Sequence, residues 1–210
     1  MEIDIDDLDG NERYRTISTL VAPRPIAWVS TRSADGIDNL APFSFFNIIS
    51  SRNPPVLMFS PGVKPGGAAW KDTAANVAET GECVINFVTP DMAAKMDETS
   101  HSVDAEVSEF DFANVERAES VKVDPPRVGN TSASIECKEY DILEIGNNTA
   151  VLAEVVYIHL DDDLVADHED LPDPLAYCSN LVGRIGGPYF TAIEPLDLES
   201  VSISKLWVDN

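Results

Sequence analysis

The fold is decided by the stretch SASIECKEYDILEIGNNTAVLAEVVYIHL, residues 132–160. Two long runs of β-forming residues, Ser132–Leu143 and Ala150–Leu160, lie on either side of Gly146-Asn147-Asn148. Glycine and asparagine adopt the positive φ angles of tight hairpin turns at little energetic cost. The stretch therefore predicts a long antiparallel β-hairpin.

Shorter strand patterns precede this hairpin at residues 25–31, 39–47, 56–60 and 82–88. Asp35-Gly36 predicts a turn between the first two of these strands. A helix is predicted to start at Lys71-Asp72-Thr73, capped by Asp72 or Thr73, and to end at Gly81. A second helix is predicted from Thr89-Pro90-Asp91 to about Glu98. Many short strands with two confident helices indicate a mainly β protein, an antiparallel Greek-key barrel with peripheral helices.

The 210 residues are expected to form one domain. We expect an acidic N-terminal leader over residues 1–12, the barrel domain over residues 13–195, and a C-terminal tail over residues 196–210. The N-terminus lacks the apolar segment of a signal peptide, and no apolar run reaches the roughly 18 residues of a membrane span. Cys83, Cys137 and Cys178 have no metal-binding spacing and are expected to be mostly buried thiols in a reducing cytoplasm.

The chain is strongly acidic. Asp and Glu number 37 against 14 Lys and Arg, which gives a net charge of −23. This field repels nucleic acids and anionic membranes, so neither is an expected partner. The acids interrupt well-patterned apolar segments, which indicates an acidic coat on a folded domain. Such a coat is typical of adaptation to high salt, where the Debye length falls to about 3 Å and charges are screened.

Lys71 is the most informative of the few cations. It precedes a predicted helix N-terminus, where unpaired N–H groups and the helix dipole favour an anion such as a phosphate. By spacing alone, the alternative that Lys71 is solvated and Asp72-Thr73 only caps the helix is favoured. Arg24 and Arg184, beside Pro and Gly residues, could likewise clamp an anion or stack on a ring, or form ordinary surface ion pairs.

Residues 39–47, NLAPFSFFN, mix small, aromatic and hydroxyl side chains. A planar heterocycle would use such a mixture for its faces and its polar edge, although a barrel strand filling the core has the same composition. His101, His159 and His168 lie far apart and form no metal-binding motif. No residue is therefore nominated as catalytic or as a metal ligand.

Taken in order, these segments resemble the flavin reductase-like, FMN-binding split-barrel family, in the branch that includes flavoredoxin. The resemblance covers about residues 12–190 and rests on an ordered series of short motifs. These are Arg24-Pro25-Ile26-Ala27 with Val29-Ser30-Thr31, residues 39–47, Pro54-Pro55, Phe59-Ser60, Lys71-Asp72-Thr73 with Asn76, residues 83–86, residues 108–111, residues 136–138, and Gly183-Arg184 with Gly186-Gly187 and Tyr189. The series favours a phosphate-binding role for Lys71 over the solvated alternative.

The resemblance implies a homodimer with FMN in a groove near the subunit interface and NAD(P)H as electron donor. It implies that the flavin or its ribityl chain approaches Ser30 and Thr31, and that the ring edge lies along Ala41, Pro42, Phe43 and Ser44, near Asn47. The phosphate would contact Ser60, Lys71, Asp72 and Thr73, with Arg184 as a further contact.

Three functions are compatible with this resemblance. The first is an NAD(P)H-dependent flavin reductase or related FMN oxidoreductase. The second is a flavoredoxin-like electron carrier that exchanges electrons with a redox protein partner. The third is a flavin-binding module without catalytic activity.

The acidic coat generates a prediction for stability. We expect the melting temperature to rise with KCl concentration, because salt screens the repulsion among surface carboxylates. Thermal unfolding followed by circular dichroism across a KCl series measures this. A melting temperature that does not respond to KCl would contradict salt adaptation.

Overall fold

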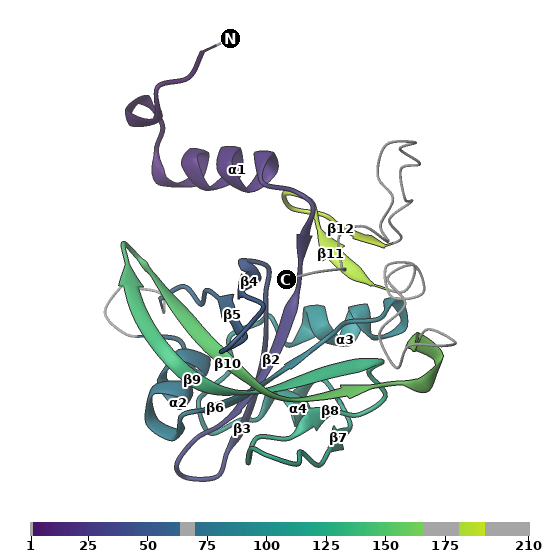
Figure 1. Ribbon diagram of the computed structural model, residues 1–210. Coiled ribbons are helices and arrows are strands. Elements are labelled where there is room, and N and C mark those ends of the chain that lie inside the picture. Colours follow the sequence, from purple (N-terminus) through teal and green to yellow (C-terminus); the bar gives the residue numbers. More distant parts are fainter. Residues whose placement is uncertain (1, 64–69, 166–180, 192–210) are drawn as a thin grey trace.

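A computed structural model describes residues 2–63, 70–165 and 181–191 of the chain. The predicted hairpin forms its largest feature: strand β9 (Ala133–Ile145) pairs with β10 (Asn148–Leu160), as Figure 1 shows. Gly146 takes the left-handed conformation, with a φ of 60°, at the turn. The register shifts at two places along the ladder, and such bulges increase the local bend and twist of a sheet.

Seven strands form one antiparallel sheet in the order β3-β2-β6-β9-β10-β5-β4. The other strands are β2 (Ala27–Arg32), β3 (Asp38–Phe43), β4 (Phe46–Ser50), β5 (Val56–Phe59) and β6 (Glu82–Asn86). β3 and β4 occupy opposite edges of this sheet, yet only Ser44 and Phe45 separate them in the chain. The sheet must therefore curl until its two edges approach each other, which confirms the expected split barrel.

The remaining elements lie around this barrel (Figure 1). A three-stranded sheet contains β1 (Arg24–Pro25), β11 (Val182–Arg184) and β12 (Tyr189–Thr191), and β7 (Arg117–Ala118) pairs with β8 (Arg127–Val128). The helices are α1 (Gly10–Leu20), α2 (Asp72–Thr80), α3 (Ala93–Glu98) and α4 (Glu109–Phe112), with 3-10 turns at Ile5–Asp7, Pro90–Met92 and Asp162–Leu164. No helix within the described residues is long and apolar enough to cross a membrane.

Two apolar clusters hold these elements together. One lies inside the barrel, where Val29, Phe59 and Val151 are fully buried and α2 contributes Ala74 and Val77. The other includes Ile26, Trp28 and Leu40 and packs against residues of α3 and α4. Neighbouring residues of β2, such as Trp28 and Val29, belong to different clusters, because successive side chains of a strand point to opposite faces. Both faces of β2 are thus covered.

Three sequence expectations need correction or lie beyond the description. The single strand expected over residues 39–47 is broken at Ser44-Phe45, where the chain passes from one sheet edge to the other. The expectation of an acidic leader over residues 1–12 did not include the 3-10 turn at Ile5–Asp7 or helix α1. The capping box of α1 joins Asp9 and Glu12. Cys83 and Cys137 are buried thiols, whereas Cys178, His168 and the expected tail over residues 196–210 lie outside the described residues.

The small sheet yields a prediction at Gly183. A Cβ atom there would lie 2.3 Å from Cε1 of Phe190 and 2.9 Å from the carbonyl oxygen of Arg24. We expect Gly183→Ala to lower the free energy of unfolding by about 1–3 kcal/mol, because the strand or the ring must move. Denaturant unfolding measures the loss, with Gly187→Ala as the matched control because its Cβ meets no atom within 4 Å. Equal stability of the two variants would contradict the expected clash.

Candidate functional site

The two candidate residues of β2 are built into the protein interior. Ser30 and Thr31 are fully buried. The Ser30 hydroxyl donates to the carbonyl of Pro126 over 2.6 Å, and Thr31 accepts a hydrogen bond from Nδ2 of Asn76 at 3.0 Å. Their hydroxyls therefore hold neighbouring segments in place.

Helix α2 is fixed to the sheet through two amide–hydroxyl hydrogen bonds. One is the bond from Asn76 of α2 to Thr31 of β2. The other runs from Nδ2 of Asn39, on β3, to Oγ1 of Thr73 at 2.9 Å. All four of these side chains are buried, so the bonds are protected from competition by water. The start of α2 consequently has a defined position relative to β2 and β3.

The helix begins at Asp72, with Lys71 as its N-cap and no capping hydrogen bond from a side chain. The expected cap by Asp72 or Thr73 is therefore wrong, because both lie within the first turn and Thr73 turns its hydroxyl inward to Asn39. First-turn N–H groups have no intrahelical partner. Lys71, which is half-buried, thus stands beside a helix end that is suited to an anion.

Ser60 lies at the same end of the barrel as Lys71. The bridge between Val63 and Trp70 closes the loop that separates them, with Ser60 three residues before it and Lys71 directly after it. The Ser60 hydroxyl accepts a hydrogen bond from Nδ2 of Asn148 at 3.2 Å, and Trp70 donates to Glu144 at 2.8 Å. The loop is therefore tied to the β9–β10 hairpin at both of its ends.

The corner between β3 and β4 supplies the amphipathic surface expected from its sequence. Ala41, Pro42 and Ser44 are half-buried, while Phe43 is buried and its ring stacks on Phe59 with centroids 5.7 Å apart. The backbone N–H of Ser60 donates to the carbonyl of Phe45 over 2.9 Å, which joins the corner to the end of β5. Small half-buried groups on a rigid apolar base form a plausible edge for a planar ligand.

Asn47 and Arg184 are less closely tied to this region. Asn47 is exposed on β4, and its side-chain oxygen accepts a local hydrogen bond from the N–H of Ile48 at 2.8 Å. Arg184 lies on β11 in the small sheet, where Nε donates to Gly187 and the guanidinium stands 4.9 Å from the Tyr189 ring centroid. Arg184 thus stacks within its own sheet.

Arg24, raised by the sequence as a second cation, is buried at 5% exposure. Its guanidinium donates to the carbonyl groups of Ser18, Val21 and Gly186 and lies 5.8 Å from the Phe45 ring centroid. Its Nε finds no hydrogen-bond partner among residues 2–63, 70–165 and 181–191. Among the described residues Arg24 is bound by backbone carbonyls and an aromatic face, and it links α1 to the β3–β4 corner.

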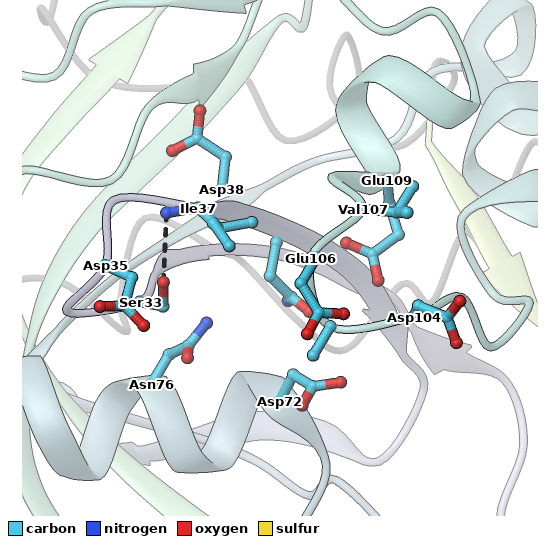
Figure 2. A pocket seen from close by; sticks show the side chains of 12 residues that line it. Ser33, Asp35, Ile37, Asp38, Asp72, Asn76, Asp104, Glu106, Val107 and Glu109 are labelled. Atoms are coloured by element: carbon cyan, nitrogen blue, oxygen red, sulfur yellow. Dashed lines mark hydrogen bonds between the residues drawn. The ribbon is translucent and has the colours of Figure 1, made fainter.

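An acidic cavity of about 160 Å³ is lined in part by Asp72 and Asn76 of α2. Figure 2 shows the side chains around it. Its lining combines an asparagine pair with carboxylates from three segments, namely Asp35, Asp38, Asp72, Asp104, Glu106 and Glu109. The pKa of Glu109 is raised above its ordinary value, mainly because the carboxyl group is buried. Hydrogen bonds from the backbone N–H groups of Leu40 and of Glu109 itself lower this pKa, and the nearby charge of Asp72 raises it further. The carboxylates give this cavity a negative electrostatic potential, which disfavours an anion inside it.

Of the predicted site residues, only Asp72 lines this cavity. A second cavity, of about 420 Å³, is flanked by Arg32 and Arg117, and both guanidinium groups are paired with the carboxylate of Asp38. Within the described parts of the chain, no three His, Cys, Asp or Glu side chains are grouped so as to hold a metal ion. Lys71, Ser60 and the β3–β4 corner line neither of these two cavities.

Glu136 is a fully buried carboxylate at the centre of β9. Residues 136–138 belong to the motif series, but the sequence assigned no role to Glu136. It accepts hydrogen bonds from Nε2 of His159 at 2.5 Å and from the backbone N–H groups of Val121 and Lys122 at 2.7 and 2.6 Å. Burial alone raises the pKa of Glu136, but these hydrogen bonds outweigh it and hold the pKa below its ordinary value. The signals in the sequence were its position inside a strand pattern and its place in the motif series.

The sequence is similar to a known protein family and to several known proteins. Residues 20–186 match the family described as the flavin reductase like domain. An uncharacterised protein of Aquifex aeolicus is 36% identical over 190 residues, covering 90% of this chain and 94% of its own length. The Halalkalibacterium halodurans protein BH2278, also uncharacterised, is 33% identical over 98% of this chain and 99% of its own length.

Several solved structures share the fold of this chain. Nitrilotriacetate monooxygenase component B from Bacillus cereus superposes with a TM-score of 0.86 at 25% identity, covering 94% of this chain and 98% of that one. The Pseudomonas fluorescens 2-nitrobenzoate 2-nitroreductase NbaA has a TM-score of 0.82 at 26% identity, with coverage of 94% and 95%. Flavoredoxin of Desulfovibrio vulgaris shares the fold, with a TM-score of 0.73 at 19% identity and coverage of 95% and 98%.

The Glu136 cluster generates a prediction about pH. Because the pKa of Glu136 is lower in the folded than in the unfolded state, its contribution to stability is complete above the unfolded pKa. The contribution is lost as the pH falls through the folded pKa. We expect Glu136→Gln to destabilise the protein at neutral pH by about 1.5–3 kcal/mol and to flatten this acid dependence.

Urea unfolding of both proteins between neutral and acid pH measures the effect. Glu116→Gln is the matched control, because Glu116 is an exposed carboxylate that accepts a hydrogen bond from Asn130. Parallel acid profiles for wild type and Glu136→Gln would contradict the assignment.

Proposed function

This chain belongs to the flavin reductase-like family of oxidoreductases, and we propose that it binds FMN and accepts electrons on that flavin from NAD(P)H. The observation that carries the proposal is the start of α2. Lys71 is its N-cap, no side chain caps it, and the amphipathic β3–β4 corner is joined through Ser60 to the loop that precedes it.

The phosphate of FMN is assigned to Lys71, Ser60 and the first-turn N–H groups of α2. Lys71 supplies a point charge, the helix end supplies aligned N–H donors, and Ser60 supplies a hydroxyl. Asp72 lies in the first turn on the acidic side, so we propose that its contact, and that of the buried Thr73, is made through the backbone. The hydroxyl of Thr73 keeps the helix in place through Asn39.

The ring system is assigned to the β3–β4 corner. Ala41, Pro42 and Ser44 would lie along its edge over the base formed by Phe43, with Asn47 nearby and the backbone of Ser30 and Thr31 beneath. Arg184 is a more distant contact, because it stacks on Tyr189 in the small sheet. The residues at the corner are small and half-buried, so they exclude water from one side of a bound heterocycle while leaving the other open to a donor.

When bound, the flavin supplies the redox chemistry, with N5 as the hydride acceptor. The protein has to bind, orient and tune it, and this requires no general base. We propose that the backbone N–H groups of Ala41, Phe43 and Ser44 would stabilise negative charge on a reduced ring and so raise its potential. The acidic coat opposes the approach of a dinucleotide phosphate, so we propose that reduction by NAD(P)H is faster at high salt.

We further propose that the protein acts as a homodimer, with the flavin near the interface, in the cytoplasm. The corner that would hold the ring lies at the sheet edges β3 and β4. A site at a sheet edge is readily completed by a second subunit. No partner oxygenase is assigned.

The phosphate assignment makes a sharp prediction for Lys71→Ala. We expect its affinity for FMN to fall about ten- to a hundredfold, because one charge-assisted contact is worth about 1.5–3 kcal/mol. Its affinity for riboflavin, which lacks the phosphate, should change little. Titration followed by flavin fluorescence measures both, and Lys122→Ala, an exposed lysine of the loop beyond β7, is the control. An equal loss for both ligands would make Lys71 structural.

The function is tested by NAD(P)H oxidation in high-salt buffer with FMN present. We expect turnover with at least one nicotinamide, seen as loss of absorbance of the reduced form. Bound FMN that no nicotinamide reduces but a reduced protein donor does would replace the proposal by an electron carrier. Bound FMN that neither donor reduces would indicate a flavin-binding module, and the absence of flavin binding would overturn the proposal entirely.

A further inference from the structure

The acidic cavity beside α2 shares only Asp72 with the proposed flavin site. Its volume is about 160 Å³, several times the roughly 30 Å³ that one water molecule occupies in the liquid. Among the described residues that line it there is no Lys, Arg or His. Its six carboxylates attract cations of every kind. A specific site also needs polar atoms in the cavity that lack a partner.

Two buried asparagines supply such atoms. Asn39 and Asn76 both line the cavity, with exposed fractions of 7% and 8%. Nδ2 of Asn39 donates to the hydroxyl of Thr73. Nδ2 of Asn76 donates to Thr31, and neither threonine lines the cavity. Within the described residues, no group donates to the side-chain oxygen of either asparagine. A buried carbonyl oxygen without a donor is costly, so both oxygens need a donor from within the cavity.

The two amide groups are fixed close to each other. Asn39 of β3 lies directly opposite Thr31 of β2. Thr73 and Asn76 are three residues apart on α2, which places them on the same face of the helix. The two hydrogen bonds therefore connect one turn of the helix to one cross-strand pair. Because each side chain is held through its nitrogen, its oxygen has a defined position before any ligand binds.

Carboxylates of a third segment complete the cavity. Figure 2 shows Glu106 and Glu109 across the cavity from Asn76 of α2. Glu109 is buried at 8% exposure, and its Oε2 accepts the N–H of Leu40 at 3.0 Å. Glu106 is exposed, and its side chain makes no hydrogen bond or ion pair with the described residues. Burial raises the pKa of Glu109, and a cation in the cavity would favour its charged form.

The donor requirement selects the kind of cation. No three His, Cys, Asp or Glu side chains of the described residues converge as a metal ion requires, and the carboxylate of Asp38 is taken by Arg32 and Arg117. Amide oxygens and carboxylates are hydrogen-bond acceptors only. A primary ammonium group carries one positive charge and three N–H donors. It matches a cavity that offers two amide oxygens and nearby carboxylates.

We propose that this cavity binds a primary ammonium group. The amide oxygens of Asn39 and Asn76 accept two of its N–H donors, and a carboxylate of Glu106 or Glu109 accepts the third. The ligand class is therefore a primary amine, supplied by a free alkylamine or by a lysine side chain. This site lies beyond the proposed flavin chemistry and requires no flavin.

The experiment follows the side-chain amide signals of Asn39 and Asn76 by nuclear magnetic resonance of the nitrogen-15-labelled full chain. Propylammonium chloride is titrated at constant ionic strength, with KCl making up the balance. We expect saturable shifts of both amide signals. Tetramethylammonium, which has the same charge but no N–H donor, should bind at least about tenfold more weakly. Equal effects of the two cations, or shifts that do not saturate, would mean that the acidic coat attracts cations diffusely and would overturn the proposal.

Variants of the cavity separate its amide oxygen from the attachment of the helix. Asn76→Ala should weaken propylammonium binding about ten- to a hundredfold, because it removes a charge-assisted acceptor. Thr31→Val is the matched control, since it breaks the same hydrogen bond but keeps the amide oxygen, and its loss should be smaller. Equal losses in the two variants would contradict a direct contact. The Asn39 amide signal reports binding in both variants, and circular dichroism verifies that each is folded.

An exposed carboxylate gives a test that does not disturb the fold. Glu106→Gln should weaken propylammonium binding about two- to fivefold, as expected for a partly solvated charge. Glu79→Gln is the control, because Glu79 is an exposed carboxylate of α2 that does not line the cavity, and it should bind as wild type does. Identical affinities of wild type and Glu106→Gln would overturn the proposed site.

A final arm distinguishes the two sources of the ammonium group. A capped glycyl-lysyl-glycine peptide carries the same group as propylammonium on a peptide backbone. Tighter binding of the peptide would support the site with a lysine of a partner protein as its ligand, and weaker binding would support it with a free amine. Because no flavin is added, failure of the flavin proposal would leave these results unchanged.

Discussion

Each strand of the barrel takes its register, directly or through its neighbours, from the ladder between β9 and β10. β9 pairs with β6, which pairs with β2 and so with β3, while β10 pairs with β5 and so with β4. A slip of one residue in this ladder would turn every apolar side chain of a strand to the wrong face. Its register shifts also help to curl the sheet until β3 and β4 meet at Ser44-Phe45.

The candidate site depends on that curl and on a few buried hydrogen bonds. Asn39 and Asn76 fasten α2 to β2 and β3 through Thr73 and Thr31, so the uncapped helix start faces the same end of the barrel as Ser60. The two sides of this helix differ in charge. Asp72 lines a cavity of carboxylates, whereas Lys71 is the N-cap of the helix. In a chain this acidic, a lysine at a helix N-terminus is a local reversal of the field, and the proposed phosphate contact depends on it.

Much of the fold could be predicted where the signal is local. The long hairpin with Gly146 at its turn and the end of α2 at Gly81 follow from turn and helix-end preferences, and the structure has both. The start of α2 was predicted at Lys71-Asp72-Thr73, but its N-cap is Lys71 and not the expected Asp72 or Thr73. Helix α1 was missed although Asp9 and Glu12 form a capping box, because a helix with one buried residue shows no core-facing apolar pattern. The break at Ser44-Phe45 was missed because the apolar pattern continues through it.

The sequence by itself determined the strands, the helix start that suits an anion, the acidic coat and the family. These depend on neighbours in the chain and on composition. Only the tertiary structure decided that the hydroxyls of Ser30, Thr31 and Thr73 are consumed inside the protein, that Asp72 faces a cavity of carboxylates, and that Tyr14 of α1 contacts Phe45 at the β3–β4 corner. Burial and surface continuity arise from contacts between residues far apart in the chain, and no local pattern encodes them.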